Sequence, residues 1–131
     1  MTRLRVLLLI LYVLLIFFLS SRPYLTPLGP EFRLKDKVVH TVEYLILGVL
    51  LYTGVGWLLR KPKFTLFWIL FAIGATLAAM DEILQSFIPG RLTDLYDWVA
   101  DTIGVAIGAG VAIVISTRWG RAPGRRGGEA A

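Results

Sequence analysis

Four long apolar segments dominate this chain and decide what it can fold into. They cover residues 6–19, 38–59, 64–88 and 98–116. About 20 helical residues cross the hydrocarbon core of a bilayer, so the last three segments are long enough and the first needs its flanking residues. The sequence therefore predicts an all-α membrane protein with four transmembrane helices in a bundle, at about residues 4–20, 37–59, 64–88 and 94–116.

The composition agrees with a single small membrane domain. Hydrophobic residues make up 56% of the 131 residues, and the mean hydropathy is +0.71. We expect one transmembrane domain over residues 1–119 and a basic, disordered tail over residues 120–131. The first segment has an alternative interpretation as a cleaved signal peptide, because Arg3 and Arg5 precede it and Ser20 and Ser21 follow it. The chain has no cysteine, which excludes disulfides and thiolate chemistry.

Lysine and arginine are distributed unevenly between the two predicted sides of the membrane. One side carries both termini and the connection between the second and third helices, and the other side carries the remaining two connections. The first side holds nine basic residues and one acid, and the other holds five basic and eight acidic residues. The residues of the first side are Arg3, Arg5, Arg60, Lys61, Lys63, Arg118, Arg121, Arg125 and Arg126, with Glu129. The positive-inside rule therefore predicts that both termini are cytoplasmic. Because the basic residues form no face of their own, the net charge of +5 indicates topology and not nucleic-acid binding.

The acidic residues gather in three clusters, each next to an apolar segment. Eight of the nine belong to them: Glu31, Asp36 and Glu43; Asp81 and Glu82; and Asp94, Asp97 and Asp101. With the predicted topology, the second helix begins, the third ends and the fourth begins on the outer side. Ionisable groups inside a membrane are costly and usually mark function. We therefore predict one acid-rich polar site that faces outward.

The candidate residues of this site come from three helices and one loop: Asp36, Lys37, His40, Tyr44, Asp81, Glu82, Gln85, Arg91, Asp97 and Asp101. On the second helix, Asp36, His40 and Tyr44 share one face at spacings of four residues. His40 is the only histidine of the chain. Asp36 has an alternative role as a helix cap, and Tyr44 an alternative place in an interfacial aromatic belt.

The third and fourth helices contribute acids of two kinds. Asp81 and Glu82 lie near a helix carboxyl end, where they oppose the macrodipole and need cationic or hydrogen-bonding partners. With Thr93 as the predicted N-cap, Asp97 is explained by the helix dipole, whereas Asp101 lies about one turn deeper and is not.

Small residues on these two helices predict close packing of the fourth helix on the third. The expected surfaces are Ala100, Gly104, Gly108 and Ala112 against Gly74, Ala75, Ala78 and Ala79.

Two arrangements of the site stay open. In the favoured one, Lys37, His40 and Arg91 balance the acids in an internal network and no cofactor is bound. In the other, Asp81, Glu82, Asp97 and Asp101 hold a divalent cation such as Mg²⁺, because several carboxylates suit a hard cation.

Taken together, these motifs resemble the VanZ-like family of small bacterial membrane proteins. The family typically has Asn where this chain has Asp101. The matching residues run from 36 to about 115: Asp36-Lys37, His40, Tyr44, Leu47-Gly48, Asp81-Glu82, Gln85, Phe87, Pro89-Gly90-Arg91, Asp94, Asp97, Gly104 and Gly108. The resemblance implies a multi-pass protein of the bacterial cytoplasmic membrane and cell envelope, in a family linked to resistance to the glycopeptide teicoplanin.

Three functional hypotheses follow. The leading one is a non-enzymatic protein that binds an amphiphile, such as a lipid-linked or glycopeptide ligand, through Asp81, Glu82, Arg91 and His40. The alternative is a divalent-cation-dependent membrane hydrolase or transferase that acts on a lipid-linked phosphate, with His40 as general acid or base. Proton-coupled transport is the third, although the predicted cytoplasmic halves of the helices carry no ionisable residue to complete a path.

Overall fold

The computed structural model describes residues 2–22, 30–91 and 93–119, and this part of the chain is helical without strands. The helices are α1 (Thr2–Ser20), α2 (Pro30–Gly54), α3 (Lys63–Ser86) and α4 (Leu95–Trp119), with a short 3₁₀ helix, η1, at Gly56–Leu58. Each of the four α-helices is long and apolar enough to cross a membrane. The predicted fold class, a bundle of four membrane-spanning helices, is thereby confirmed; the predicted tail lies outside the described residues.

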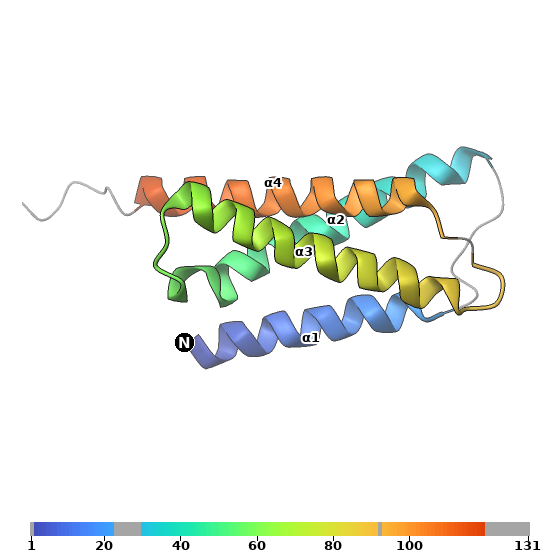
Figure 1. The fold of residues 1–131 in the computed structure, drawn as a ribbon, viewed down its shortest axis with the longest axis horizontal. Helices are drawn as coiled ribbons and strands as arrows, with labels where there is room; N and C mark the ends of the chain where they lie inside the picture. The colour runs from blue at the N-terminus through green and yellow to red at the C-terminus, as the bar shows by residue number, and fades with distance from the viewer. Residues whose placement is uncertain (1, 23–29, 92, 120–131) are drawn as a thin grey trace, which may run out of the picture.

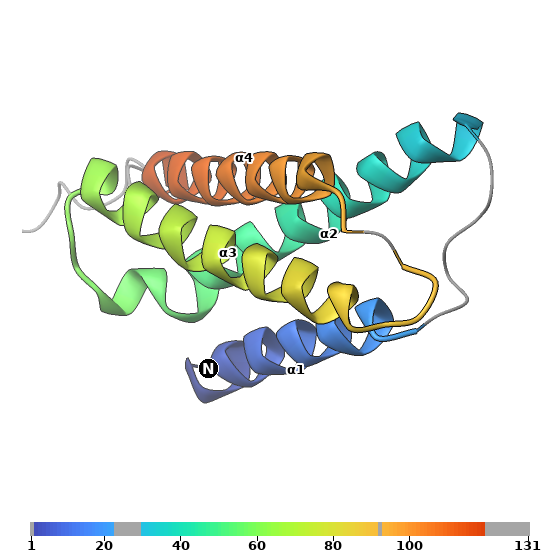
Figure 2. The same ribbon diagram turned by 45° about the vertical axis from the view of Figure 1, so that its right-hand side comes forward.

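The four helices run alternately up and down, so that the same two ends of the bundle are visited in turn (Figures 1 and 2). At one end α1 and α3 finish and α2 and α4 start; we call it the polar end because the buried acids lie there. The opposite end, the basic end, holds the start of α1, the connection from α2 to α3 and the finish of α4.

The closest packing joins α4 to α2, and the expected packing of the α4 glycines on α3 is wrong. A Cβ atom added to Gly104 or Gly108 would overlap the backbone carbonyl of Thr41 or Leu45 on α2, and one on Gly48 would lie 2.6 Å from the Val105 carbonyl oxygen. Gly104 and Gly108 form a G-x-x-x-G pattern, which lets two helix backbones approach.

Helix α3 packs on α4 through side chains instead. A Cβ on Gly74 would meet the Val105 side chain, and the Trp98 indole Nε1 donates a hydrogen bond of 3.1 Å to the Ala75 carbonyl. The core between the helices contains Ile16, Tyr44, Leu47, Leu70 and Val105, whereas many leucines and valines face outward, as a lipid-embedded bundle requires.

The helix ends differ from the sequence predictions for local reasons. Residues 30–36, which precede the helix predicted at residues 37–59, are the first turns of α2. This helix starts with Pro30, in the position where the fixed φ of proline suits a helix. Helix α3 ends at Ser86, before the restriction that Pro89 places on Ile88. The N-cap of α4 is Asp94 and not Thr93, because Asp94 Oδ1 accepts a hydrogen bond of 2.9 Å from the Tyr96 amide.

Candidate functional site

A cluster of buried polar side chains occupies the polar end of the bundle. All four helices contribute to it. Its members are less than a tenth exposed: Ser20 from α1, His40 from α2, Asp81, Glu82 and Gln85 from α3, and Asp97 and Asp101 from α4. Six of these seven were predicted from the sequence, and Ser20 was not. The structure thus draws together acids of the second and third acidic clusters, and His40 joins them from α2.

One half of the cluster lies between α2 and α4 and is made of ion pairs. His40 Nδ1 lies 3.0 Å from Asp101 Oδ1, and the Lys37 ammonium lies 2.6 Å from Asp97 Oδ1 and 3.0 Å from Asp94 Oδ2. The glycine contact explains this pairing, because it brings the backbones of α2 and α4 close enough for short side chains to meet. Because Asp101 is fully buried, its carboxylate needs a partner within the protein, and the His40 imidazole is that partner.

The other half lies between α3 and α1, and there the Asp81 carboxylate is bound by neutral hydrogen-bond donors. Asp81 Oδ2 accepts a hydrogen bond of 2.7 Å from the Ser20 hydroxyl and one of 3.0 Å from Gln85 Nε2. Arg91 donates to the backbone carbonyl of Ser20. Among the described residues, Arg91 forms no ion pair with a carboxylate, so the predicted balance of acids by Arg91 does not occur as a direct contact.

Ser20 could not be assigned to the site from its sequence position. A serine at the end of an apolar segment is common at a helix terminus, and nothing in the chain marks Asp81 as its partner. Only the packing of α1 against α3 brings the two together.

Three buried carboxylate oxygens have no hydrogen-bond partner within the described residues: Asp81 Oδ1, Glu82 Oε1 and Asp101 Oδ2. The buried ionisable side chains in this part of the chain are four carboxyls, one imidazole and the Tyr44 phenol. Lys37 and Arg91, which are partly buried, add two further cations. Unpartnered buried acceptors are costly, so the cluster has unused capacity for a ligand that supplies positive charge or hydrogen-bond donors.

A groove on the surface of the bundle leads to Glu82. It has a volume of about 560 Å³ and lies between the end of α3 and the start of α4. Its walls are mostly apolar, and Glu82, Ser86 and Thr93 are its polar residues; Ala79, Ile83, Leu95 and Trp98 complete the lining. The groove therefore joins an apolar surface to a buried carboxylate, which is the combination that an amphiphile needs.

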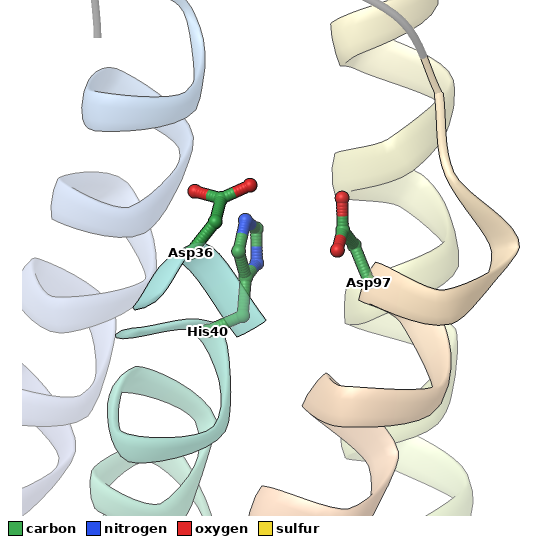
Figure 3. Close-up of side chains that lie close together, drawn as sticks. All are labelled: Asp36, His40 and Asp97. Carbon is green, nitrogen blue, oxygen red and sulfur yellow. The ribbon is translucent and has the colours of Figure 1, made fainter. Parts of the chain in front are cut away.

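A separate group of potential metal ligands lies between α2 and α4. Donor atoms of Asp36, His40 and Asp97 all lie within 4.8 Å of one another. Figure 3 shows the His40 ring between the carboxylates of Asp36 and Asp97, with the first two residues on α2 and the third on α4. Of the four residues that the sequence suggested as cation ligands, this group contains Asp97 alone.

The structure excludes the alternative roles that the sequence allowed for Tyr44 and Asp36. Tyr44 belongs to the core and is 1% exposed, so it is not in an aromatic belt at the lipid interface. Asp36 lies in the second turn of α2, which begins at Pro30, and so it is not the cap of that helix.

Comparison with known proteins identifies a family for this chain. The VanZ/LLP1 family matches the chain over residues 5–116. No curated protein and no solved structure matches it. The matched range begins in α1 and ends in α4, so it includes every helix and the whole buried polar cluster. With four membrane-spanning helices and a match over most of its length, the chain is a multi-pass membrane protein that belongs to the VanZ/LLP1 family.

Proposed function

We propose that this protein is a non-enzymatic component of the bacterial cell envelope that binds an amphiphile at its polar end. The head group of the amphiphile donates hydrogen bonds to Asp81, Glu82 and Asp101 or pairs with them as a cation. Its apolar part lies in the groove between α3 and α4. The observation that carries the proposal is the set of three buried, unpartnered carboxylate oxygens beside an apolar groove.

The charge of the cluster defines the head group. Four buried carboxyls outweigh one imidazole and the partly buried cations Lys37 and Arg91, so the cluster attracts a cation and repels a bare phosphate or carboxylate. A head group with a primary amine or several hydroxyl groups satisfies this requirement. Lipid-linked precursors and glycopeptides with such groups are the ligands in view, and the family's link to teicoplanin resistance makes the glycopeptide worth testing.

We propose further that the polar end faces the outside of the cytoplasmic membrane and that both termini are cytoplasmic. The described residues of the basic end support this orientation, because they include Arg3, Arg5, Arg60, Lys61, Lys63 and Arg118 and no acid. The cysteine-free chain permits a direct test with single cysteines. In intact cells, a membrane-impermeant maleimide should label Ser21→Cys and Thr93→Cys but not Lys61→Cys; the reverse pattern would refute the orientation.

Binding can be tested with the full-length protein in detergent by native mass spectrometry. The probes are phosphatidylethanolamine, phosphatidylglycerol and teicoplanin. We expect the amine-bearing probes to bind more tightly than phosphatidylglycerol, and Glu82→Gln to weaken them by about tenfold, the effect of one lost charge-assisted hydrogen bond. Asp94→Asn is the matched control, because it also removes one acid while asparagine retains the N-cap of α4.

The groove has its own pair of variants. Ala79→Phe fills it and should displace the apolar part of the ligand, whereas Thr76→Phe adds the same ring to an exposed position of α3 outside the groove. In a teicoplanin-susceptible host, Asp81→Ala and Arg91→Ala should abolish any protection that the wild-type protein gives. If all these variants bind the probes as the wild type does and leave susceptibility unchanged, the proposal is wrong.

A second candidate function is a divalent-cation-dependent hydrolase or transferase acting on a lipid-linked phosphate. The donor group of Asp36, His40 and Asp97 favours it, because a bound cation would reverse the repulsion between the acids and a phosphate. Turnover of a lipid-linked diphosphate by the purified protein, abolished by a chelator and restored by added metal, would identify this activity. Phosphate release equal to that of protein-free micelles would exclude it for that substrate.

A further inference from the structure

The group formed by Asp36, His40 and Asp97 has a feature that a chance cluster of acids lacks. Its central member is an imidazole that is only 6% exposed, and Asp97 is only 8% exposed. The three donor atoms come from two helices that are held in register by the glycine contact. Because the helix backbones fix where the side chains start, the cluster is preorganised and does not depend on a flexible loop.

The hydrogen bonding of His40 leaves one ring nitrogen for a ligand. Nδ1 lies 3.0 Å from Asp101 Oδ1, and the described residues give the ring no other hydrogen bond. A histidine that binds a metal usually donates its second N–H to a carboxylate, which fixes the ring and raises its basicity. Asp101 holds the imidazole in this way, so Nε2 is the nitrogen that remains between the Asp36 and Asp97 carboxylates (Figure 3).

Lys37 is the competitor for this space. Its ammonium binds Asp97 Oδ1 at 2.6 Å and Asp94 Oδ2 at 3.0 Å. The described residues give Asp97 Oδ2 no hydrogen bond, so one oxygen of that carboxylate remains for a ligand. Asp36 forms no ion pair within the described part of the chain. Two carboxylates beside one ammonium keep a net negative charge, which a divalent cation would offset.

We propose that Asp36, His40 Nε2 and Asp97 bind a divalent metal ion, with Asp101 as the residue that positions the imidazole. The mixed nitrogen and oxygen donors favour an ion such as Zn²⁺ or Mn²⁺ over Mg²⁺ and Ca²⁺, which prefer oxygen alone. Metal–ligand bonds of about 2.0–2.2 Å require the side chains to close in slightly from their present spacing. This site goes beyond amphiphile binding and does not depend on it.

The test uses the full-length protein, purified without a polyhistidine tag, stripped of metal and placed in nanodiscs of a zwitterionic lipid. Mn²⁺ is titrated by electron paramagnetic resonance, and Zn²⁺ by competition with it. We expect saturable binding of a single ion per chain. Asp36→Asn and Asp97→Asn should weaken binding by at least about tenfold, and Asp101→Asn by about 10–100-fold, the usual effect of losing a carboxylate partner of a ligating histidine. Glu82→Gln, which removes an acid of the other half of the cluster and forms no ion pair with Lys37 within the described residues, should leave the affinity unchanged.

A second measurement identifies the nitrogen ligand without any variant that could fail to fold. Electron spin echo modulation from bound Mn²⁺ should show an imidazole nitrogen in the wild-type protein. Binding that is no tighter in the wild type than in Asp36→Asn, or a spectrum without imidazole nitrogen, would overturn the site. Amphiphile binding is measured on the same samples, so a failure of that function appears in Glu82→Gln and a failure of the metal site appears in Asp36→Asn.

Discussion

The two halves of the buried polar cluster are built in different ways. Between α2 and α4, the helix backbones touch through glycines and each buried acid has a basic side chain, His40 or Lys37, as its partner. Between α3 and its neighbours, Asp81 and Glu82 have neutral donors, an unpartnered oxygen each and an adjacent groove. The first half, the closed half, holds α2 against α4 and contains the proposed metal ligands, whereas the second is open to the groove and has capacity for an amphiphile. Substitutions in the first half should therefore affect stability and metal binding, and those in the second half mainly amphiphile binding.

The largest expected effect on stability comes from the closed half. His40→Ala leaves the fully buried Asp101 carboxylate without its partner, and losing one member of a buried pair costs about 3–5 kcal/mol. The double variant His40→Ala/Asp101→Asn should recover much of this loss, because no buried charge is then left alone. Reversible unfolding in detergent with chelator present measures both, and equal stability of the two variants would contradict the pairing.

The glycine contact should give the next largest effect. Gly108→Ala places a Cβ against the backbone carbonyl of Leu45, and overpacking of this kind costs about 1–3 kcal/mol. Gly110→Ala is the matched control on the same helix, since its Cβ would meet only Phe67 at an ordinary distance of 3.8 Å. Thermal unfolding of both variants in one detergent tests the contact, which is disproved if they melt together.

An effect of similar size is expected where α1 meets α3. Ser20→Ala removes the hydroxyl that donates to Asp81, and a hydrogen bond to a charged group is worth about 1.5–3 kcal/mol. Ser86→Ala serves as control, because that exposed hydroxyl bonds only to the Ile83 carbonyl of its own helix. Denaturant titration should separate the two; a loss as large in Ser86→Ala would mean that the inter-helix bond contributes nothing.

The smallest expected effect is at Lys37. Its ion pairs are partly exposed, with 29% of the lysine side chain accessible, so Lys37→Met should cost at most about 1 kcal/mol. The difference from wild type should shrink as salt is added, because screening weakens exposed pairs first. A loss that is large and independent of salt would place Lys37 with the buried pairs.

The sequence predicts the helices and the polar end well because both depend on long runs of residues. Four apolar segments of membrane-spanning length leave few alternatives to a bundle, and alternation of the chain direction brings Asp36, Asp81 and Asp97 to one end regardless of packing details.

The sequence predicts the contacts less well, because they depend on how each helix is rotated about its axis. Small residues on α3 and α4 suggested that those two pack most closely, but Gly104 and Gly108 face α2. The same rotation brings Lys37 into contact with Asp97, and Asp81 accepts its hydrogen bond from Ser20. Apolar periodicity is a weak guide to rotation in a membrane, since lipid and protein surroundings are both apolar.

The backbone contact between α2 and α4 has a consequence for the response of the protein to its bilayer. Two helices that interlock through Gly48, Gly104 and Gly108 cannot slide along each other without a backbone clash. In a thinner or thicker membrane, the pair therefore has to tilt as one unit. The distance between His40 and Asp101 therefore does not change with lipid composition, so the protein can keep its ion-pair geometry in membranes of different thickness.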